Sequence, residues 1–166
     1  LVGRQSLRFA NEDARLYGVD IASSKALGQL GGQWALRTSL AYVKAKADGG
    51  DNLYNIMPLN ARIALDHAYG VWSSRLEAVL VENKDRVSAL RAEQQTAGYS
   101  LVNFRTSFDL SSKVRLDAGI DNLFDRMHRL PLGGLEYASA DMMTGVAPST
   151  MRGTGRSVNA GISVDF

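Results

Sequence analysis

Hydrophobic and polar residues alternate along most of this chain, and the pattern is clearest at its C-terminal end. Between Ser157 and Phe166 every second residue is apolar, and the residues between them are polar or small. A period of two predicts a β-strand with one apolar face and one polar face. Residues 157–166 match the length of a strand that spans a membrane, whereas strands of soluble proteins average about five or six residues.

The same alternation recurs upstream and predicts seven further strands. Their apolar positions run through Leu7–Phe9, Tyr17–Ile21, Trp34–Tyr42, Leu59–Leu65, Trp72–Leu80, Val102–Leu110 and Val114–Ile120. The segment around Leu7 carries the weakest pattern. The sequence therefore predicts an all-β chain of about eight antiparallel strands.

The predicted connections alternate between short turns and long loops. Short turns fall at Leu27–Gly32, Tyr69-Gly70 and Ser111-Ser112, and long loops at 47–58, 83–98 and 126–155, with one short exception at Asn11–Ala14. This sorting is typical of outer-membrane barrels, whose turns face the periplasm and whose loops face the outside. Within the second loop, residues 87–95 fit either one or two helical turns or an extension of the hairpin.

Aromatic residues fall at both ends of the predicted strands. Near the turn end lie Trp34, Tyr69, Trp72 and Phe108, and near the loop end lie Tyr17, Tyr42 and Tyr99. Amphipathic rings at the two membrane–water interfaces produce two such belts. His67 lies beside Tyr69 on the apolar face, and we interpret it as an interfacial residue rather than a metal ligand.

The polar faces of the strands are rich in charge. They carry Arg37, Arg62, Asp66, Arg75, Glu77, Arg105, Asp109, Arg115, Asp117 and Asp121. So many ionised groups would destabilise the core of a small soluble barrel, whereas a wide, hydrated or plugged lumen accommodates them. We therefore expect the apolar faces to meet lipid. The alternative is a soluble carrier of the lipocalin type, or an enzyme on that scaffold, whose apolar faces line an inner pocket.

Composition and charge exclude several other classes. The net charge is +2 and the charged residues are scattered, which argues against nucleic-acid binding. No apolar run approaches the roughly 18 residues of a membrane helix, and the absence of cysteine excludes disulfides and thiolate metal sites. No carboxylate is tied to a His or Ser as in a nucleophile arrangement, and Leu132–Leu135 does not lead from a strand into a helix as a phosphate loop does. We expect no catalytic residues and no enzymatic activity.

Several short motifs occur in a recognisable order. Asn122-Leu123-Phe124-Asp125 follows the penultimate strand, and a long loop leads to Gly155-Arg156 and a last strand that ends in Phe166. Upstream stand Tyr17-Gly18-Val19-Asp20, Met57-Pro58-Leu59-Asn60 and Ala97-Gly98-Tyr99. Together these segments resemble the C-terminal part of TonB-dependent outer-membrane receptors, and the resemblance covers essentially all of residues 1–166.

The resemblance implies a barrel of about 22 strands in the outer membrane of a Gram-negative cell. Such a barrel is closed by an N-terminal plug domain and driven by the inner-membrane TonB complex. Residues 1–166 would form the last third of the wall, as a mature chain or a fragment without plug or TonB box. The last strand and Phe166 would be read by the barrel-assembly machinery. A complete small barrel that serves as an anchor or adhesin is the alternative.

The motif residues Asn122, Leu123, Phe124 and Asp125 are expected to be structural, with Phe124 packing and Asp125 bonding to backbone. Leu130–Gly134, followed by a loop that contains methionine, most resembles the copper-receptor branch of the family.

The implied function is energised uptake of a scarce metal or metal chelate, such as copper or a siderophore-type ligand, with the metal as cargo and no certain resident cofactor. Candidate ligands are Met127, His128, Met142, Met143 and Met151, because thioether and imidazole groups suit copper. The alternative is that the methionines pack the loop and that His128 is a solvated rim residue.

Overall fold

The computed structural model of the chain describes residues 13–136 and 148–165. The strand expected around Leu7, the terminal Phe166 and the loop residues Met142 and Met143 lie outside the described residues. No helix in the described part is long and apolar enough to cross a membrane.

One antiparallel sheet of seven strands makes up most of the described chain. Its strands are β1 (Ala14–Gly28), β2 (Gln33–Ala47), β3 (Asn60–Tyr69), β4 (Trp72–Val81), β5 (Tyr99–Ser111), β6 (Val114–Asp121) and β9 (Ser157–Val164). They are hydrogen-bonded in the order β1-β2-β3-β4-β5-β6-β9, so each strand pairs with its neighbours in the sequence. The predicted all-β antiparallel architecture is confirmed, as are the seven predicted strands that fall within the described residues.

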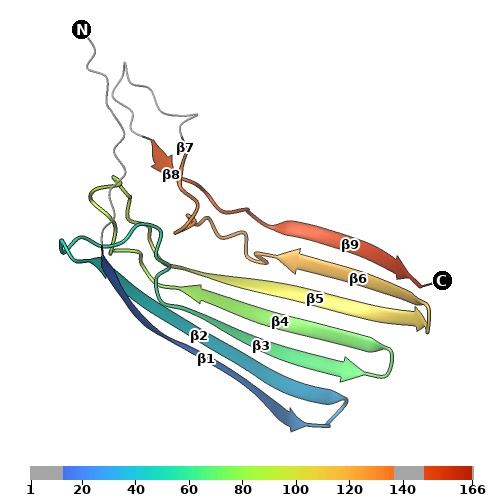
Figure 1. Cartoon of the computed structure of the whole chain (residues 1–166). Coiled ribbons are helices and arrows are strands. Elements are labelled where there is room, and N and C mark those ends of the chain that lie inside the picture. Colours follow the sequence, from blue (N-terminus) through green and yellow to red (C-terminus); the bar gives the residue numbers. More distant parts are fainter. Residues whose placement is uncertain (1–12, 137–147, 166) are drawn as a thin grey trace.

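The short turns and long loops are sorted to opposite ends of the sheet, as predicted. Figure 1 shows the β1–β2, β3–β4 and β5–β6 turns at one end, where β9 also finishes, and the longer connections at the other. Glycines with positive φ form two of these turns, Gly31 (64°) with Gly32 (124°) and Gly70 (57°). The sheet does not close on itself, because β1 and β9 are its two edges.

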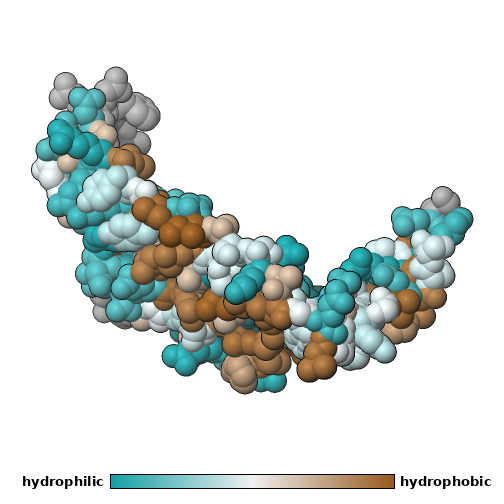
Figure 2. All heavy atoms as spheres, turned by 90° about the horizontal axis from the view of Figure 1, so that it is seen from below, coloured by the Kyte–Doolittle hydropathy of each residue, from teal (hydrophilic) through white to brown (hydrophobic). Residues whose placement is uncertain are grey.

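The strand register fixes which residues share a face. Leu36 lies opposite Leu65, which lies opposite Leu76, and the aliphatic row continues through Phe104 and Ile120. The alternate positions form a polar row, in which Asp66 lies opposite Arg75 and Arg75 opposite Arg105. Many of the apolar side chains are exposed, and Figure 2 shows them gathered across the middle of the curved wall and along its convex edge.

The long loops contain little regular structure. A two-residue hairpin, β7 (Leu135–Glu136) with β8 (Ser149–Thr150), occurs in the third loop and has no counterpart in the sequence prediction. In the second loop an isolated bridge joins Lys84 to Thr96, and turns rather than a helix connect them. The hairpin is therefore extended only as far as this bridge, and residues 87–95 themselves form turns without a helix or a strand.

Candidate functional site

The concave face of the sheet holds a chain of ion pairs in the part of the strands nearer the turns. Asp66 on β3 accepts from Arg37 on β2 at 2.6 Å and from Arg75 on β4 at 2.5 Å. The second contact is bidentate, since Arg75 also donates to Oδ2 of Asp66 at 3.2 Å. One carboxylate thus holds two guanidinium groups across three strands, which fixes their geometry and leaves an excess of positive charge.

A second group of polar contacts continues across β5, β6 and β9. Arg105 donates to Asp121 at 2.6 Å, and Asn159 of β9 donates to the other oxygen of Asp121 at 3.2 Å. Gly119 makes room for this arrangement, because a Cβ there would lie 2.6 Å from the side-chain oxygen of Asn159. The charged residues predicted for the inner face therefore share the concave side, where Arg37 and Arg75 pair with Asp66 and Arg105 pairs with Asp121 across neighbouring strands.

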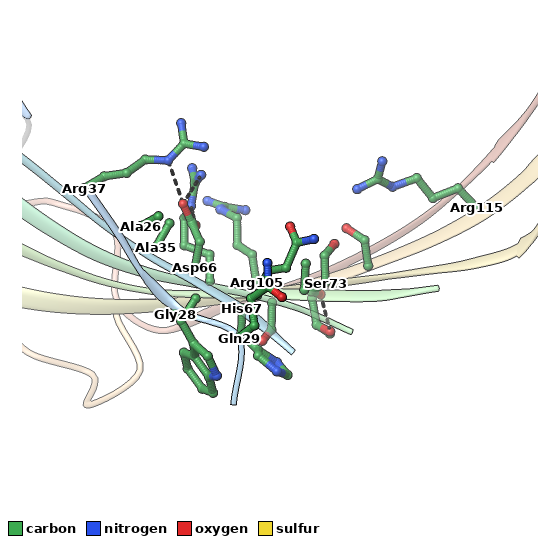
Figure 3. Close-up of a pocket in the computed structure, with 17 residues that line it drawn as sticks. Ala26, Gly28, Gln29, Ala35, Arg37, Asp66, His67, Ser73, Arg105 and Arg115 are labelled. Atoms are coloured by element: carbon green, nitrogen blue, oxygen red, sulfur yellow. Dashed lines mark hydrogen bonds and ion pairs between the residues drawn. The ribbon is translucent and has the colours of Figure 1, made fainter. Parts of the chain in front are cut away.

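A hollow of about 700 Å³ lies at the turn end of this concave face. Its polar lining includes Arg37, Asp66, Arg75, Arg105, Ser107 and Arg115. Figure 3 shows Arg37, Asp66 and Arg115 on one side of the ribbon and His67 on the other. The hollow is open to solvent, as a section of a wide hydrated lumen would be, and it holds no closed ligand pocket.

The convex face carries the predicted aromatic belt at the turn end. Trp34 packs against His67, with 4.2 Å between ring centroids, and its indole donates to the carbonyl of Leu30 at 2.9 Å. His67 is also 2.9 Å from the carbonyl of Gly31. These contacts fit the interfacial role predicted for His67, because both Trp34 and His67 turn a polar atom toward the turn, whereas the indole of Trp72 donates to Thr106 further along the sheet.

At the loop end the prediction for Tyr99 needs a correction. Tyr17 and Tyr42 lie on the convex face, but Tyr99 pairs with Val81, whose side of the sheet is the concave one. The Tyr99 ring packs on His128 at 4.5 Å. Tyr99 therefore lies at the rim but supports an inner loop, and it does not belong to the outer aromatic belt.

The motif at residues 122–125 forms a bonded turn at the loop end of β6. Asn122 is buried, adopts a positive φ of 51°, and its side chain bonds to Arg126 N (2.8 Å), Arg126 O (2.9 Å) and Thr154 O (3.2 Å). Asp125 accepts from the backbone N–H of Arg156 at 2.7 Å. These bonds join residues 122–125 to residues 154–156, which are far apart in the sequence, and so hold the start of β9 beside the end of β6.

The roles expected of the motif are found in part. Asp125 bonds to backbone as predicted, whereas Phe124 is 72% exposed and makes no core in the described residues. Leu123 contributes its backbone N–H to the carbonyl of Val102 at 2.8 Å.

A buried ion pair joins the three loops, and no pattern in the sequence predicts it. Lys84 is 2% exposed, donates to Glu93 at 2.6 Å and donates to the carbonyl of Pro131 at 2.8 Å. Glu93 also accepts from the backbone N–H groups of Asn55 and Ser88. Residues from all three long loops therefore meet at this pair, which we call the loop clasp.

Electrostatics around the loop clasp favour its ionised form. Burial alone would raise the pKa of Glu93, but the hydrogen bonds from Lys84, Ser88 and Asn55 outweigh it and hold that pKa below its ordinary value. The pKa of Asp51 is lowered chiefly by the backbone N–H of Leu90, with help from Ser88. Both carboxylates are thus bound as anions.

The candidate metal ligands are spread over the third loop. Met127 is 85% exposed and Met151 44% exposed, while His128 is half-buried against Tyr99 and Gly153. Within the described residues no group of three or more His, Cys, Asp or Glu side chains could hold a metal. Met142 and Met143 lie outside the described residues.

A curved meander, apolar outside and ionic inside, with turns at one end and loops at the other, defines a section of β-barrel wall. Residues 2–123 match the family described as TonB dependent receptor-like, beta-barrel, and the chain belongs to this family.

Two solved structures share the fold. The structure titled "Copper transporter OprC" is 27% identical with a TM-score of 0.83, and the match covers 94% of this chain and 25% of that one. The ferric yersiniabactin uptake receptor FyuA from Yersinia pestis is 18% identical with a TM-score of 0.67, over 93% of this chain and 24% of that one, and shows the fold alone. The chain therefore spans about a quarter of each. No curated protein matches it.

Proposed function

We propose that this chain forms part of the wall and the outer loops of an outer-membrane receptor for the energised uptake of a scarce metal or metal chelate. The observation that carries the proposal is the division of the sheet into an exposed apolar convex face and an ion-paired concave face. An apolar band facing lipid and a polar interior are what a membrane barrel with a wide lumen requires.

The remaining parts of such a receptor would act on the concave wall. A plug domain would fill the lumen against the arginine-rich hollow, and an energy-transducing TonB complex would move it from the periplasm. The loop end would face the outside and meet the cargo first. Membership of the family supports this arrangement, because its members are TonB-dependent receptors.

Copper is the cargo that we propose. The supporting observations are the likeness to a copper transporter at 27% identity and a third loop that carries four of the five methionines. Thioether sulfur selects Cu(I) over harder cations. A ferric chelate is the second candidate cargo, and it is supported only by a likeness in fold to a receptor for a ferric chelate.

Copper binding by the whole receptor tests the proposal. Met142→Leu/Met143→Leu is expected to weaken Cu(I) binding at least about tenfold, since each soft ligand lost costs a coordinate bond. Met57→Leu is the matched control, because Met57 lies in the first loop and outside the candidate set. Equal Cu(I) affinity in the double variant and the unaltered receptor would end the copper assignment. Copper accumulation in cells with and without TonB tests the energised step separately.

A further inference from the structure

The convex face changes character near the loop end of β1 and β2. At mid-strand it is aliphatic, with Ile21 opposite Leu40, and nearer the turn it carries Ser23 opposite Thr38 and Lys25 opposite Leu36. Above them the same face carries Arg15 opposite Lys46 and Tyr17 opposite Lys44. These three cations above an aliphatic band are not explained by the lumen, because they face away from it.

The cations and tyrosines of this region form one compact group. Residues directly opposite in an antiparallel pair have Cβ atoms about 5 Å apart, and the next row on the same face is about 7 Å away. Lys44 Nζ lies 5.7 Å from the centre of the Tyr17 ring. Arg86, from the second loop, lies 5.1 Å from the centre of the Tyr42 ring and donates to its hydroxyl at 2.8 Å. We call Arg15, Tyr17, Tyr42, Lys44, Lys46 and Arg86 the rim patch.

The rim patch has more cations than carboxylates. Its one ion pair among the described residues joins Arg15 to Asp48 at 3.7 Å, with side chains 87% and 53% exposed. A pair so exposed contributes little and is easily exchanged for another anion. On the concave face, by contrast, Arg37, Arg75 and Arg105 each have a carboxylate within 2.6 Å. Among the described residues, the cations of the rim patch are therefore less closely paired with carboxylates than the arginines of the inner wall.

The height of the rim patch matches the level of lipid headgroups. From Trp34 in the turn-end belt to Lys44 the strand rises roughly 34 Å at about 3.4 Å per residue. A strand tilt of about 40° reduces this to roughly 26 Å, close to the apolar band of about 25 Å in outer-membrane barrels. Lys44 and the residues above it then lie where the hydrocarbon ends on the loop side.

We propose that the rim patch binds the phosphate groups of an anionic lipid in the outer leaflet. The tyrosine rings lie at the boundary of the acyl chains, and the four cations surround the phosphates above it. The inference rests on the proposed function in one respect, the assignment of the loop end to the outside of the membrane. It adds a lipid ligand on the side of the wall opposite the lumen.

The test uses the whole receptor in phosphatidylcholine vesicles that contain either bisphosphorylated lipid A or the same lipid with its phosphates removed. We expect preferential binding of the phosphorylated lipid, and Lys44→Gln/Lys46→Gln to weaken it about tenfold or more, since each cation near a charged membrane surface contributes. The matched control is Lys25→Gln/Lys113→Gln, which removes two cations at the turn end. Heat-modifiable migration checks that both variants are folded.

Three results would overturn the inference. Equal weakening by both double variants would mean that any cation at either interface suffices. Equal binding of the dephosphorylated lipid would leave the tyrosines as simple interfacial anchors. Displacement of the lipid by millimolar inorganic phosphate would identify a site for free anions. If the unaltered receptor enters neither kind of vesicle, the proposed function itself fails, which is a separate outcome.

Discussion

Asn122 combines a strained backbone conformation with three side-chain hydrogen bonds, and each can be tested. We expect Asn122→Ala to destabilise the receptor by about 2–4 kcal/mol, because three hydrogen bonds to the backbone of Arg126 and Thr154 are lost and alanine disfavours positive φ. Asn122→Gly restores the backbone freedom and should recover about 1 kcal/mol of that loss. Unfolding by urea in vesicles, followed on heat-modifiable gels, measures both.

The control is Asn159→Ala, which removes a bond to Asp121 from an exposed side chain and should cost less than about 1 kcal/mol. Equal stability of Asn122→Ala and Asn159→Ala would contradict the structural role of the motif.

For single residues, the sequence predicted which positions have a structural role, but it did not predict their contacts. The motif at residues 122–125 stood out by its resemblance, yet its bonds to Thr154 and Arg156 depend on how a 30-residue loop returns, which local pattern cannot give. Tyr99 was misplaced for a similar reason. A terminal strand residue can belong to either face, and the register with Val81 decides it.

Among the elements, the strands could be predicted and the loops could not. Alternation reports directly on two-faced strands, so β1 to β6 and β9 follow from local sequence. The loop clasp joins Lys84 and Glu93 with Asn55 and Pro131, and no periodic pattern marks contacts between separate loops.

The loop clasp should show strong coupling between its two charges. Lys84→Met leaves the carboxylate of Glu93 buried without its cation, which we expect to cost about 3–5 kcal/mol of loop stability. Lys84→Met/Glu93→Gln should cost less than the single variant, because the amide carries no unpaired charge and its one carbonyl oxygen can still accept from Ser88 or Asn55. Amide exchange of Lys84 and Thr96, whose backbones bond to each other, measures the opening free energy. If the losses of loop stability caused by Lys84→Met and Glu93→Gln simply add in the double variant, the two side chains are not energetically coupled.

The loop clasp should also respond to acid. Because the pKa of Glu93 lies below its ordinary value of 4.5, its contribution is fully present above about pH 4.5 and is lost as the pH falls through the lowered value. Protection of the Ser88 and Asn55 amides, corrected for intrinsic exchange, should therefore be constant from pH 7 to 5 and decline at lower pH. Glu93→Gln should give a flatter profile, whereas an identical decline in that variant would assign the effect to other groups such as Asp51.

Over the whole molecule, the division into two faces predicts opposite responses at neighbouring positions. Ile21 lies on the convex face and is 54% exposed, whereas Ala22 on the same strand lies on the concave face opposite Ser39. Ile21→Arg should destabilise the receptor in lipid vesicles by about 2–4 kcal/mol, because the guanidinium would face hydrocarbon. Ala22→Arg should change stability by less than about 1 kcal/mol, since that side chain would face the hydrated wall.

Urea unfolding of both variants in vesicles measures the difference, and both keep the same strand and net charge. A soluble carrier would also be destabilised by Ile21→Arg, because its apolar face would line the interior, but it would stay folded and show this loss in detergent-free buffer, whereas a membrane barrel would need detergent or lipid. Equal stability of the two variants would contradict the membrane orientation. Since the lumen, the lipid-binding rim patch and the outward loops all follow from that orientation, this pair of substitutions tests the physical basis that they share.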